Sequence, residues 1–256
     1  MTQPLTRIRA YLDDLLKPTS SSDPEGDGLL VGGRPDVRRL GAALNTSFSA
    51  IDAAASAEVD LLLVHHAPWS QIDLHLREPK LARLTELGVS LYSAHETLDR
   101  AQRIGVGNML ANLIGIEIEN EGGNGLIVGI ARSHDLESWL KQVVAALKSP
   151  VRAWPNNPTF QRVGIVPGGG GSTHALAAAL ERGCDTFLTG EGSLYTELFA
   201  REIGMTLVYA SHVATEFPGI CALAAHISAE FALPWVALPE AIEITGGGKA
   251  PLQYGW

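Results

Sequence analysis

A short pattern occurs twice in this chain and constrains its fold more than any other feature. Each copy is an apolar run ending in tyrosine, then two small residues, a histidine and, four positions after the histidine, a carboxylate. The copies are Tyr92–Asp99 and Tyr209–Glu216. Residues at this spacing share one face when the segment makes a helical turn. The pattern predicts either a metal-binding pair or a histidine with an acid partner in each half of the chain.

The repetition extends upstream of both copies. Val59–His66 precedes the first copy as Gly183–Glu191 precedes the second, and both are apolar runs that end in polar residues. A strand, a helix and a further strand in this order predict a parallel crossover. We therefore expect an α/β fold of two similar α/β lobes with mixed or mainly parallel sheets, and a metal site in the cleft between the lobes.

The two lobes are expected to occupy residues 1–125 and 126–256. The pattern of predicted strands and helices loosens between residues 117 and 158, and the hinge between the lobes is expected at residues 155–158. Glycines 246–248 begin a tail that is either flexible or docked on a neighbour. Hydrophobic periodicity and breakers predict the main elements. Helices are expected at 5–16, 49–57, 81–87, 102–114, 136–147 and 221–231, and strands at 61–64, 89–94, 126–131, 162–166 and 235–238.

Composition excludes several classes of function. The chain has 256 residues, of which 46% are hydrophobic, enough to bury the core of one or two domains. Its net charge of −9 argues against binding to nucleic acid, which needs clustered Lys and Arg. No apolar run reaches the roughly 20 residues of a membrane span, and no signal peptide is evident at the start, so a cytoplasmic location without a membrane partner is expected. Cys184 and Cys221 form no C-x-x-C pair, which excludes a zinc ribbon.

A double histidine, His65-His66, ends the apolar run at 61–64 and precedes Ala67-Pro68. Adjacent residues inside a strand face opposite sides, but both rings can point into one cleft where a strand ends and the chain turns. Open α/β sheets bind ligands at the carboxyl ends of their strands. Together with the two His-x-x-x-acid copies, the double histidine predicts a dinuclear metal site. Its expected members are His65, His66, His95, Asp99, His212 and Glu216.

Two further features are candidates for function. Glu191 ends the strand equivalent to the one bearing His66, so it is a candidate general base or a residue that supports a metal ligand, or else an ordinary charge at a helix start. The loop Gly168, Gly169, Gly170, Gly171 and Ser172 lies between a strand and an Ala-rich helix, where free amides attract anions. The alternative for this loop is a tight turn before a packed helix. Asp60 and Asp185 start equivalent strands and are expected to be structural.

The chain resembles a known family at four of these stretches, which are Val64–His66, Ser93–Asp99, Thr189–Glu191 and Ser211–Gly219. The family is that of the NIF-three-like dinuclear-metal proteins, often described as type 2 homologues of GTP cyclohydrolase I. The resemblance implies the compact form without an inserted domain, ring-shaped homohexamers and two divalent metal ions per chain. The implied ligands are His65, His66, Asp99, His212 and a bridging Glu216, with His95 close by.

This chain departs from the family at two places. Trp69-Ser70 follows Ala67-Pro68 where many relatives have a Pro-Leu pair, which is expected to change only the shape of the pocket. Tyr195 or its neighbours stand where some relatives have a histidine, which weakens any mechanism that relies on a histidine there.

The expected function is that of a dinuclear metal-dependent hydrolase, in which a metal-activated water attacks a small phosphorylated or heterocyclic substrate. His95 or Glu191 is the candidate for moving the proton. Imidazole and carboxylate ligands suit Zn, Fe, Mn or Ni. GTP as the substrate rests on the family name alone, because no guanine-reading motif is identifiable. The alternative is a metal-binding assembly or scaffold protein without turnover.

Overall fold

A computed structural model of the chain describes residues 2–18, 23, 25–121 and 125–240, so the predicted glycine-rich tail at 246–248 lies outside the described residues. The described chain forms two compact units. Among the described residues, the first contains those up to Ile104 and those from Gly219 to Glu240, and the second contains Gly105–Pro218. None of the helices in the described part of the chain combines the length and the apolar character needed to span a membrane.

A five-stranded sheet forms the centre of the first unit. Its strands lie in the order β13 (Trp235–Ala237), β4 (Leu40–Asn45), β5 (Leu61–His66), β6 (Ser90–Ala94) and β2 (Asp27–Val31). The first four are parallel and β2 pairs antiparallel with β6. The parallel crossover predicted between β5 and β6 is thus confirmed. The short strands β1 (Gln3–Pro4) and β3 (Asp36–Val37) form a separate antiparallel pair.

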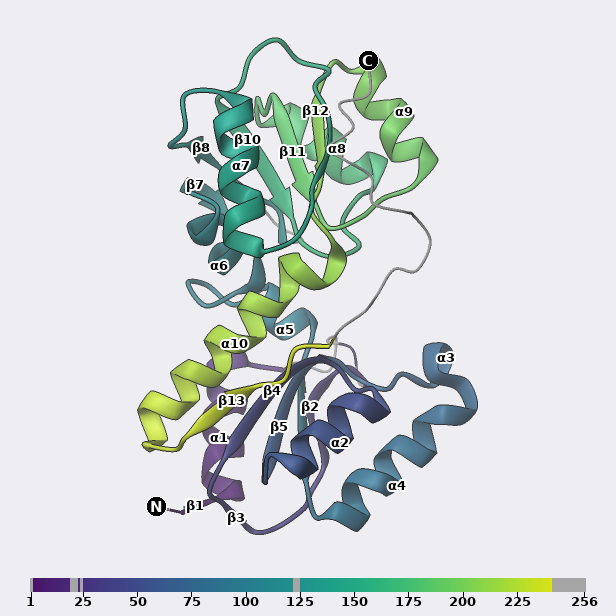
Figure 1. The fold of residues 1–256 in the computed structure, drawn as a ribbon, viewed down its shortest axis with the longest axis vertical. Coiled ribbons are helices and arrows are strands. Elements are labelled where there is room, and N and C mark those ends of the chain that lie inside the picture. Colours follow the sequence, from purple (N-terminus) through teal and green to yellow (C-terminus); the bar gives the residue numbers. More distant parts are fainter. Residues whose placement is uncertain (1, 19–22, 24, 122–124, 241–256) are drawn as a thin grey trace. The chain divides into compact units, whose positions relative to one another are not determined.

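Helices cover this sheet because its strands are apolar on both faces. Leu62 and Val64 of β5 pack in one buried cluster with α2 (Phe48–Ser56) and α4 (Arg77–Leu87), which lie together in Figure 1. Side chains alternate between the two faces along each strand. Tyr92 of β6 lies on the opposite face of the sheet from Leu62 and Val64. Its hydroxyl donates to Asp13 of α1 (Leu5–Leu16) at 3.0 Å. The remaining short helices of this unit are α3 (Ser70–Asp73), the 3₁₀ turn η1 (Leu74–Leu76) and α5 (Glu96–Asp99).

A six-stranded mixed sheet forms the second unit. The order is β7 (Ile116–Glu121), β8 (Ile127–Ala131), β10 (Arg162–Val166), β11 (Thr186–Thr189), β12 (Thr206–Tyr209) and β9 (Arg152–Trp154). The central β10, β11 and β12 are parallel, while the outer strands pair antiparallel. The helices are α6 (Val106–Leu113), α7 (Leu136–Leu147), α8 (Thr173–Glu181) and α9 (Leu194–Glu202). Both units are therefore of the predicted mixed α/β class.

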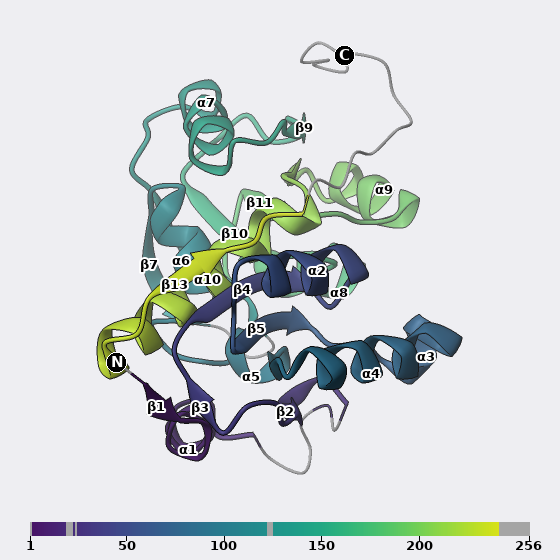
Figure 2. The same cartoon turned by 60° about the horizontal axis from the view of Figure 1, so that its bottom comes forward.

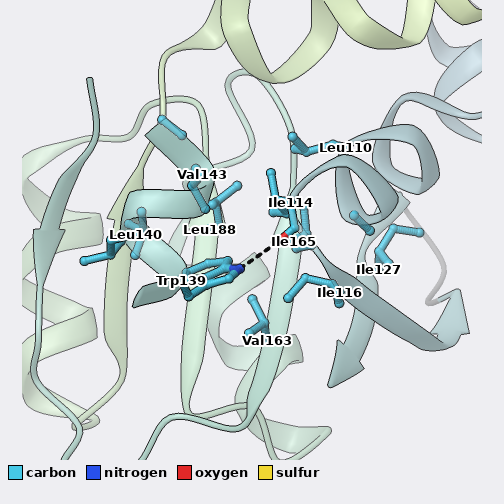
Figure 3. Close-up of a cluster of buried hydrophobic side chains, with 13 residues drawn as sticks. Leu110, Ile114, Ile116, Ile127, Trp139, Leu140, Val143, Val163, Ile165 and Leu188 are labelled. Atoms are coloured by element: carbon cyan, nitrogen blue, oxygen red, sulfur yellow. Dashed lines mark hydrogen bonds between the residues drawn. The ribbon is translucent and has the colours of Figure 1, made fainter. Parts of the chain in front are cut away.

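Trp139 is the centre of the larger core cluster in this unit (Figure 3). It lies on α7 and packs with Leu188, Ile165 and Val163 of the sheet. Its indole Nε1 donates to the buried carbonyl of Ile114, just after α6, at 3.0 Å. The opposite face of the sheet packs against α8 and α9, with Leu176, Ala179, Phe187, Ala200 and Leu207 in the contact.

The predicted division between residues 125 and 126 differs from the observed units. β7 joins the second unit because it pairs with β8. The carboxyl-terminal part returns to the first unit because β13 pairs in parallel with β4, as the yellow and dark blue strands show in Figures 1 and 2. The boundary falls inside α10 (His212–Phe231), after Pro218. This helix begins at His212 and not at Cys221, where the sequence predicted it.

Candidate metal centre

Three histidines gather at the carboxyl ends of neighbouring parallel strands in the first unit. His65 and His66 end β5, and His95 directly follows β6. Their nitrogen ligand atoms all lie within 4.8 Å of one another. His65 is buried and the other two are half-buried. The turn expected after the double histidine thus brings both rings to one place.

Asp99 joins this group from the end of α5. Its backbone N–H donates to the carbonyl of His95 at 3.1 Å, so one helical turn connects the two residues as their spacing predicts. Its Oδ1 lies 3.8 Å from Nε2 of His65. Asp27 fixes the start of this turn, since its Oδ1 accepts the His95 N–H at 2.8 Å and the Thr97 hydroxyl at 2.6 Å. Sequence reasoning missed Asp27, which the β2–β6 register places opposite Ala94.

The Nδ1 atom of each of the two strand histidines is held by a hydrogen bond. Nδ1 of His65 lies 2.8 Å from the carbonyl of Ala94, and Nδ1 of His66 lies 2.7 Å from Oδ1 of Asn45. Carbonyl and amide oxygens only accept, so each Nδ1 carries the proton and donates it. Nε2 of each ring then keeps the lone pair that a metal ion requires. Metal-binding histidines are commonly oriented by such a bond.

The second copy of the pattern lies in the second unit, at the start of α10. Nε2 of His212 is 3.0 Å from Oε2 of Glu216, one turn later, and Nδ1 of His212 is 2.9 Å from Oε1 of Glu191. The hydrogen bond to Glu216 raises the pKa of His212 to about 9; burial opposes this shift and Glu191 adds to it. In the metal-free protein the two carboxylates therefore hold a positive charge at neutral pH. The same pair of carboxylates favours a bound cation.

Gly168 lets the glycine loop approach this pair closely. Its φ is +59°, and a Cβ at this position would overlap Oε1 of Glu216 and lie 2.9 Å from Nε2 of His212. Its N–H donates to the hydroxyl of Thr215 at 3.0 Å. Thr215 is fully buried on α10 and was not predicted, because no spacing in the sequence pairs it with the loop. The loop thus forms the wall behind the His212–Glu216 pair.

The predicted anion cradle finds little support in the loop geometry. The N–H groups of Gly168, Gly170, Gly171 and Ser172 already donate within the chain, to Thr215 Oγ1 and to the carbonyls of Pro167, Glu191 and Gly170. These bonds favour the alternative reading of a tight turn. The loop therefore shapes the surroundings of the His212–Glu216 pair.

Trp69 contacts the histidine group in the first unit. Its ring lies 4.9 Å from that of His95 in an edge-to-face arrangement and 5.7 Å from that of His66, measured between centroids. Its Nε1 donates to Asp23. The departure from the family pattern at this position thus places a large aromatic ring beside the candidate ligands. Tyr195, the other departure, has 73% of its surface exposed.

The donor atoms fit a divalent metal ion. Imidazole nitrogen and carboxylate oxygen are the ligands of Zn and of other first-row divalent ions. The groupings of His and Glu side chains could bind a metal ion. Fold and site together define a class of protein. Its members are mixed α/β proteins with candidate histidine and carboxylate donors at the carboxyl ends of parallel strands.

Comparison with known proteins identifies the family within this class. The family model described as Duf34/NIF3 (NGG1p interacting factor 3) matches residues 4–242, so the chain belongs to this family. A protein of Deinococcus radiodurans named GTP cyclohydrolase 1 type 2 homolog is 31% identical over 235 residues, covering 88% of this chain and 89% of the relative. A Pseudomonas aeruginosa protein of the same name is 32% identical over 218 residues, covering 81% and 85%.

Solved structures agree with this assignment. The chain is similar to the protein ybgI of unknown function, with a TM-score of 0.85 and 25% identity over 93% of this chain and 98% of that one. It is also similar to TTHA1606 from Thermus thermophilus, with a TM-score of 0.80 and 28% identity over 94% and 100% of the two chains. The resemblance seen at the histidine and carboxylate motifs is thus confirmed across nearly the whole chain.

Proposed function

We propose that the chain binds two divalent metal ions and uses them to hydrolyse a small heterocyclic or phosphorylated substrate. The donors are His65, His66 and Asp99 of the first unit and His212 and Glu216 of the second, with His95 as a further ligand or neighbour. One observation carries the proposal: Nδ1 of His65 and Nδ1 of His66 each donates to a carbonyl or amide oxygen, and this arrangement leaves Nε2 of each ring as the nitrogen that can bind a metal ion. Metal-binding histidines commonly donate their other ring N–H in this way.

The residues around these donors have separable roles in this proposal. Bound divalent ions would lower the pKa of a coordinated water and polarise the substrate. Glu191 orients His212 through Nδ1, and its exposed carboxylate can also take a proton. His95, half-buried next to His65 and His66, is the second candidate for moving a proton. Trp69 limits the space beside these rings.

The substrate is proposed by class only. Relatives are named for a homology to GTP cyclohydrolase 1, which acts on a purine nucleotide as its name states, and this supports testing GTP first. An enzyme of this kind should lose turnover when Glu191 or His95 is replaced. Metal content after replacement of His95 separates its two roles, because metal stays bound only where His95 is a neighbour and not a ligand. Because Glu191 contacts His212, its replacement is expected to weaken metal binding as well.

Elemental analysis of metal per chain tests the proposal directly. The wild-type protein, purified without chelator or immobilised nickel, is compared with Glu216→Ala and with the control Glu230→Ala, which changes an exposed glutamate of α10. About two metal ions per chain in the wild type and control, as for a dinuclear site, and fewer in Glu216→Ala, are expected. Absence of bound metal in the wild type after incubation with Zn, Fe or Mn contradicts the proposal.

One observation bears on the association of chains, which the alternative of a metal-binding assembly protein requires. Large apolar side chains are exposed soon after the donor segments of both units, with Ile72, Leu74 and Leu76 following Trp69, and Leu194 and Tyr195 following Glu191. Exposed apolar groups of this kind favour contacts with other chains. They support the proposed self-association as a homohexamer, which light scattering after gel filtration measures. A metal-loaded protein with no turnover across a screen of nucleotides and phosphate esters would support the assembly role.

A further inference from the structure

A chain of hydrogen bonds leads from His66 to a distant glutamate. Nδ1 of His66 bonds to Oδ1 of Asn45, and Nδ2 of Asn45 donates to Oε2 of Glu240 at 2.7 Å. The backbone N–H of Asn45 also donates to this oxygen at 3.2 Å, and the hydroxyl of Ser47 donates to the other oxygen, Oε1. All four residues belong to the first unit.

The β4–β5 register explains why Asn45 meets His66. The two residues are direct partners at the ends of these parallel strands. The hydroxyl of Thr46 donates to the carbonyl of His66 at 2.9 Å and holds the two strand ends together. Glu240 lies beside Asn45 because β13 runs parallel to β4, and Glu240 follows the end of β13 by three residues. Asn45 is therefore fixed on both sides.

The charge of Glu240 decides which way the Asn45 amide points. A carboxylate can only accept hydrogen bonds, so the NH₂ end of Asn45 must face Glu240 and its oxygen must face His66. An amide oxygen in turn accepts only from a protonated nitrogen. Glu240 thus selects the form of neutral His66 with the proton on Nδ1 and the lone pair on Nε2.

We infer that Glu240 is a positioning residue, which sets the tautomer and the ring orientation of His66 through Asn45. Its link to metal binding rests on the function proposed above, whereas its effect on the tautomer of His66 does not. Partners that orient metal-binding histidines in this way contribute about 10- to 100-fold to metal affinity. A residue far from the double histidine in sequence therefore belongs to the metal centre without touching it.

Glu240→Ala is the sharpest test, because it removes the acceptor that holds the NH₂ end of Asn45. Asn45 can then rotate, so either nitrogen of His66 can carry the proton. Glu240→Gln is the conservative variant, because its amide oxygen can still accept from Asn45 while its NH₂ group donates to Ser47. Metal-free protein labelled with ¹⁵N-histidine is measured by two-bond ¹H–¹⁵N spectra, and the His66 signals are assigned by their loss in His66→Gln. We expect the Nδ1–H form in the wild type and in Glu240→Gln, and a mixture in Glu240→Ala.

Two further variants separate this role from a general effect on folding. Glu240→Ala introduced into Asn45→Ala should change the His66 spectrum no further, because its effect passes through Asn45. Glu230→Ala, the exposed control on α10, should leave the spectrum as in the wild type. An Nε2–H form in the wild type, or the wild-type spectrum in Glu240→Ala, overturns the inference.

Metal titration completes the test. The dissociation constant for Zn is expected to rise about 10- to 100-fold in Glu240→Ala, with no change in Glu230→Ala. If the wild type binds no metal while Glu240→Ala shows the expected tautomer change, the proposed function is contradicted and the positioning role stands. If the wild type binds metal while the tautomer is unchanged in Glu240→Ala, the positioning role is contradicted and the proposed function stands.

Discussion

At the scale of single residues, three histidines are oriented by three different kinds of acceptor. His65 donates to a backbone carbonyl, His66 to an amide oxygen, and His212 lies against a carboxylate. The histidines and acids were predictable, because their spacing and their places after apolar runs are visible in the sequence. Asn45, Thr215 and Asp27 were not, because strand register and turns bring them to the site. Nothing in their local sequence distinguishes them from ordinary polar residues.

Gly168 offers the clearest substitution at this scale. Gly168→Ala places a Cβ where the Glu216 carboxylate lies and puts alanine at φ +59°, which costs at least about 1 kcal/mol of stability. The carboxylate must move, so we expect loss of metal as well as a lower unfolding temperature. Elemental analysis and thermal unfolding measure the two effects.

Gly169→Ala is the matched control for this change. A Cβ there meets only Cε1 of His212, at 3.7 Å, which is ordinary contact. Metal content and unfolding temperature should stay close to those of the wild type. If both variants behave alike, the close approach of the loop to Glu216 does not matter for metal binding.

At the scale of elements, long periodic segments were predicted well and short ones poorly. The helix at α1 and the strand at β10 match their predicted bounds. β9 has only three residues and pairs antiparallel at the edge of its sheet, so its sequence holds too little pattern to be recognised. The start of α10 was missed because Pro218 lies inside it. Proline disfavours the helix interior, so the sequence suggested a helix that begins after it.

Trp139 tests how α7 is joined to the end of α6. Trp139→Phe keeps most of the apolar volume but leaves the buried carbonyl of Ile114 without this donor. An unsatisfied buried acceptor costs about 1–3 kcal/mol. Urea unfolding should show a loss of this size, and metal content should not change. A loss below about 0.5 kcal/mol means that this bond contributes little.

Asp60 tests how the loop before β4 is joined to the start of β5. Its fully buried carboxylate accepts from the Arg38 N–H at 2.8 Å and from the guanidinium groups of Arg38 and Arg34. Burial raises the pKa of Asp60, but the bonds from Arg38 outweigh this effect and hold the pKa below its usual value. The structural role expected from its place at a strand start is consistent with these contacts.

A lowered pKa has a defined effect on stability. The contribution of Asp60 is present above the pKa of the unfolded chain, about 3.9, and is lost as the pH falls through the lower pKa of the folded state. Asp60→Asn should therefore destabilise the protein by about 1.5–3 kcal/mol at pH 7. The difference from the wild type should shrink below about pH 4. Urea unfolding at several pH values measures it, and a constant difference contradicts the assignment.

At the scale of the whole molecule, the sequence predicted two α/β lobes but not how the chain is shared between them. Both sheets place candidate site residues after neighbouring parallel strands, β5 and β6 in one unit and β11 and β12 in the other. This duplication was visible as a repeat. The return of the chain after Gly219 was not, because the pairing of β13 with β4 joins residues far apart in sequence.

Removal of bound metal is expected to destabilise the whole molecule. A ligand that binds only the folded protein, present at about 100 times its dissociation constant, stabilises it by roughly 2.7 kcal/mol. Chelation should therefore lower the unfolding temperature of the wild type, and added Zn or Mn should restore it. Glu216→Ala, which lacks a proposed ligand, should respond much less. An equal response of both proteins to chelator contradicts the assigned donors.

The discontinuous first unit also bears on how the chain is made. A ribosome delivers the second unit, Gly105–Pro218, as one uninterrupted stretch, whereas the first unit waits for β13. Domains fold as units during synthesis. The part of the protein that is translated first is therefore the last to be completed, and until then β4 exposes an unpaired edge to other nascent chains.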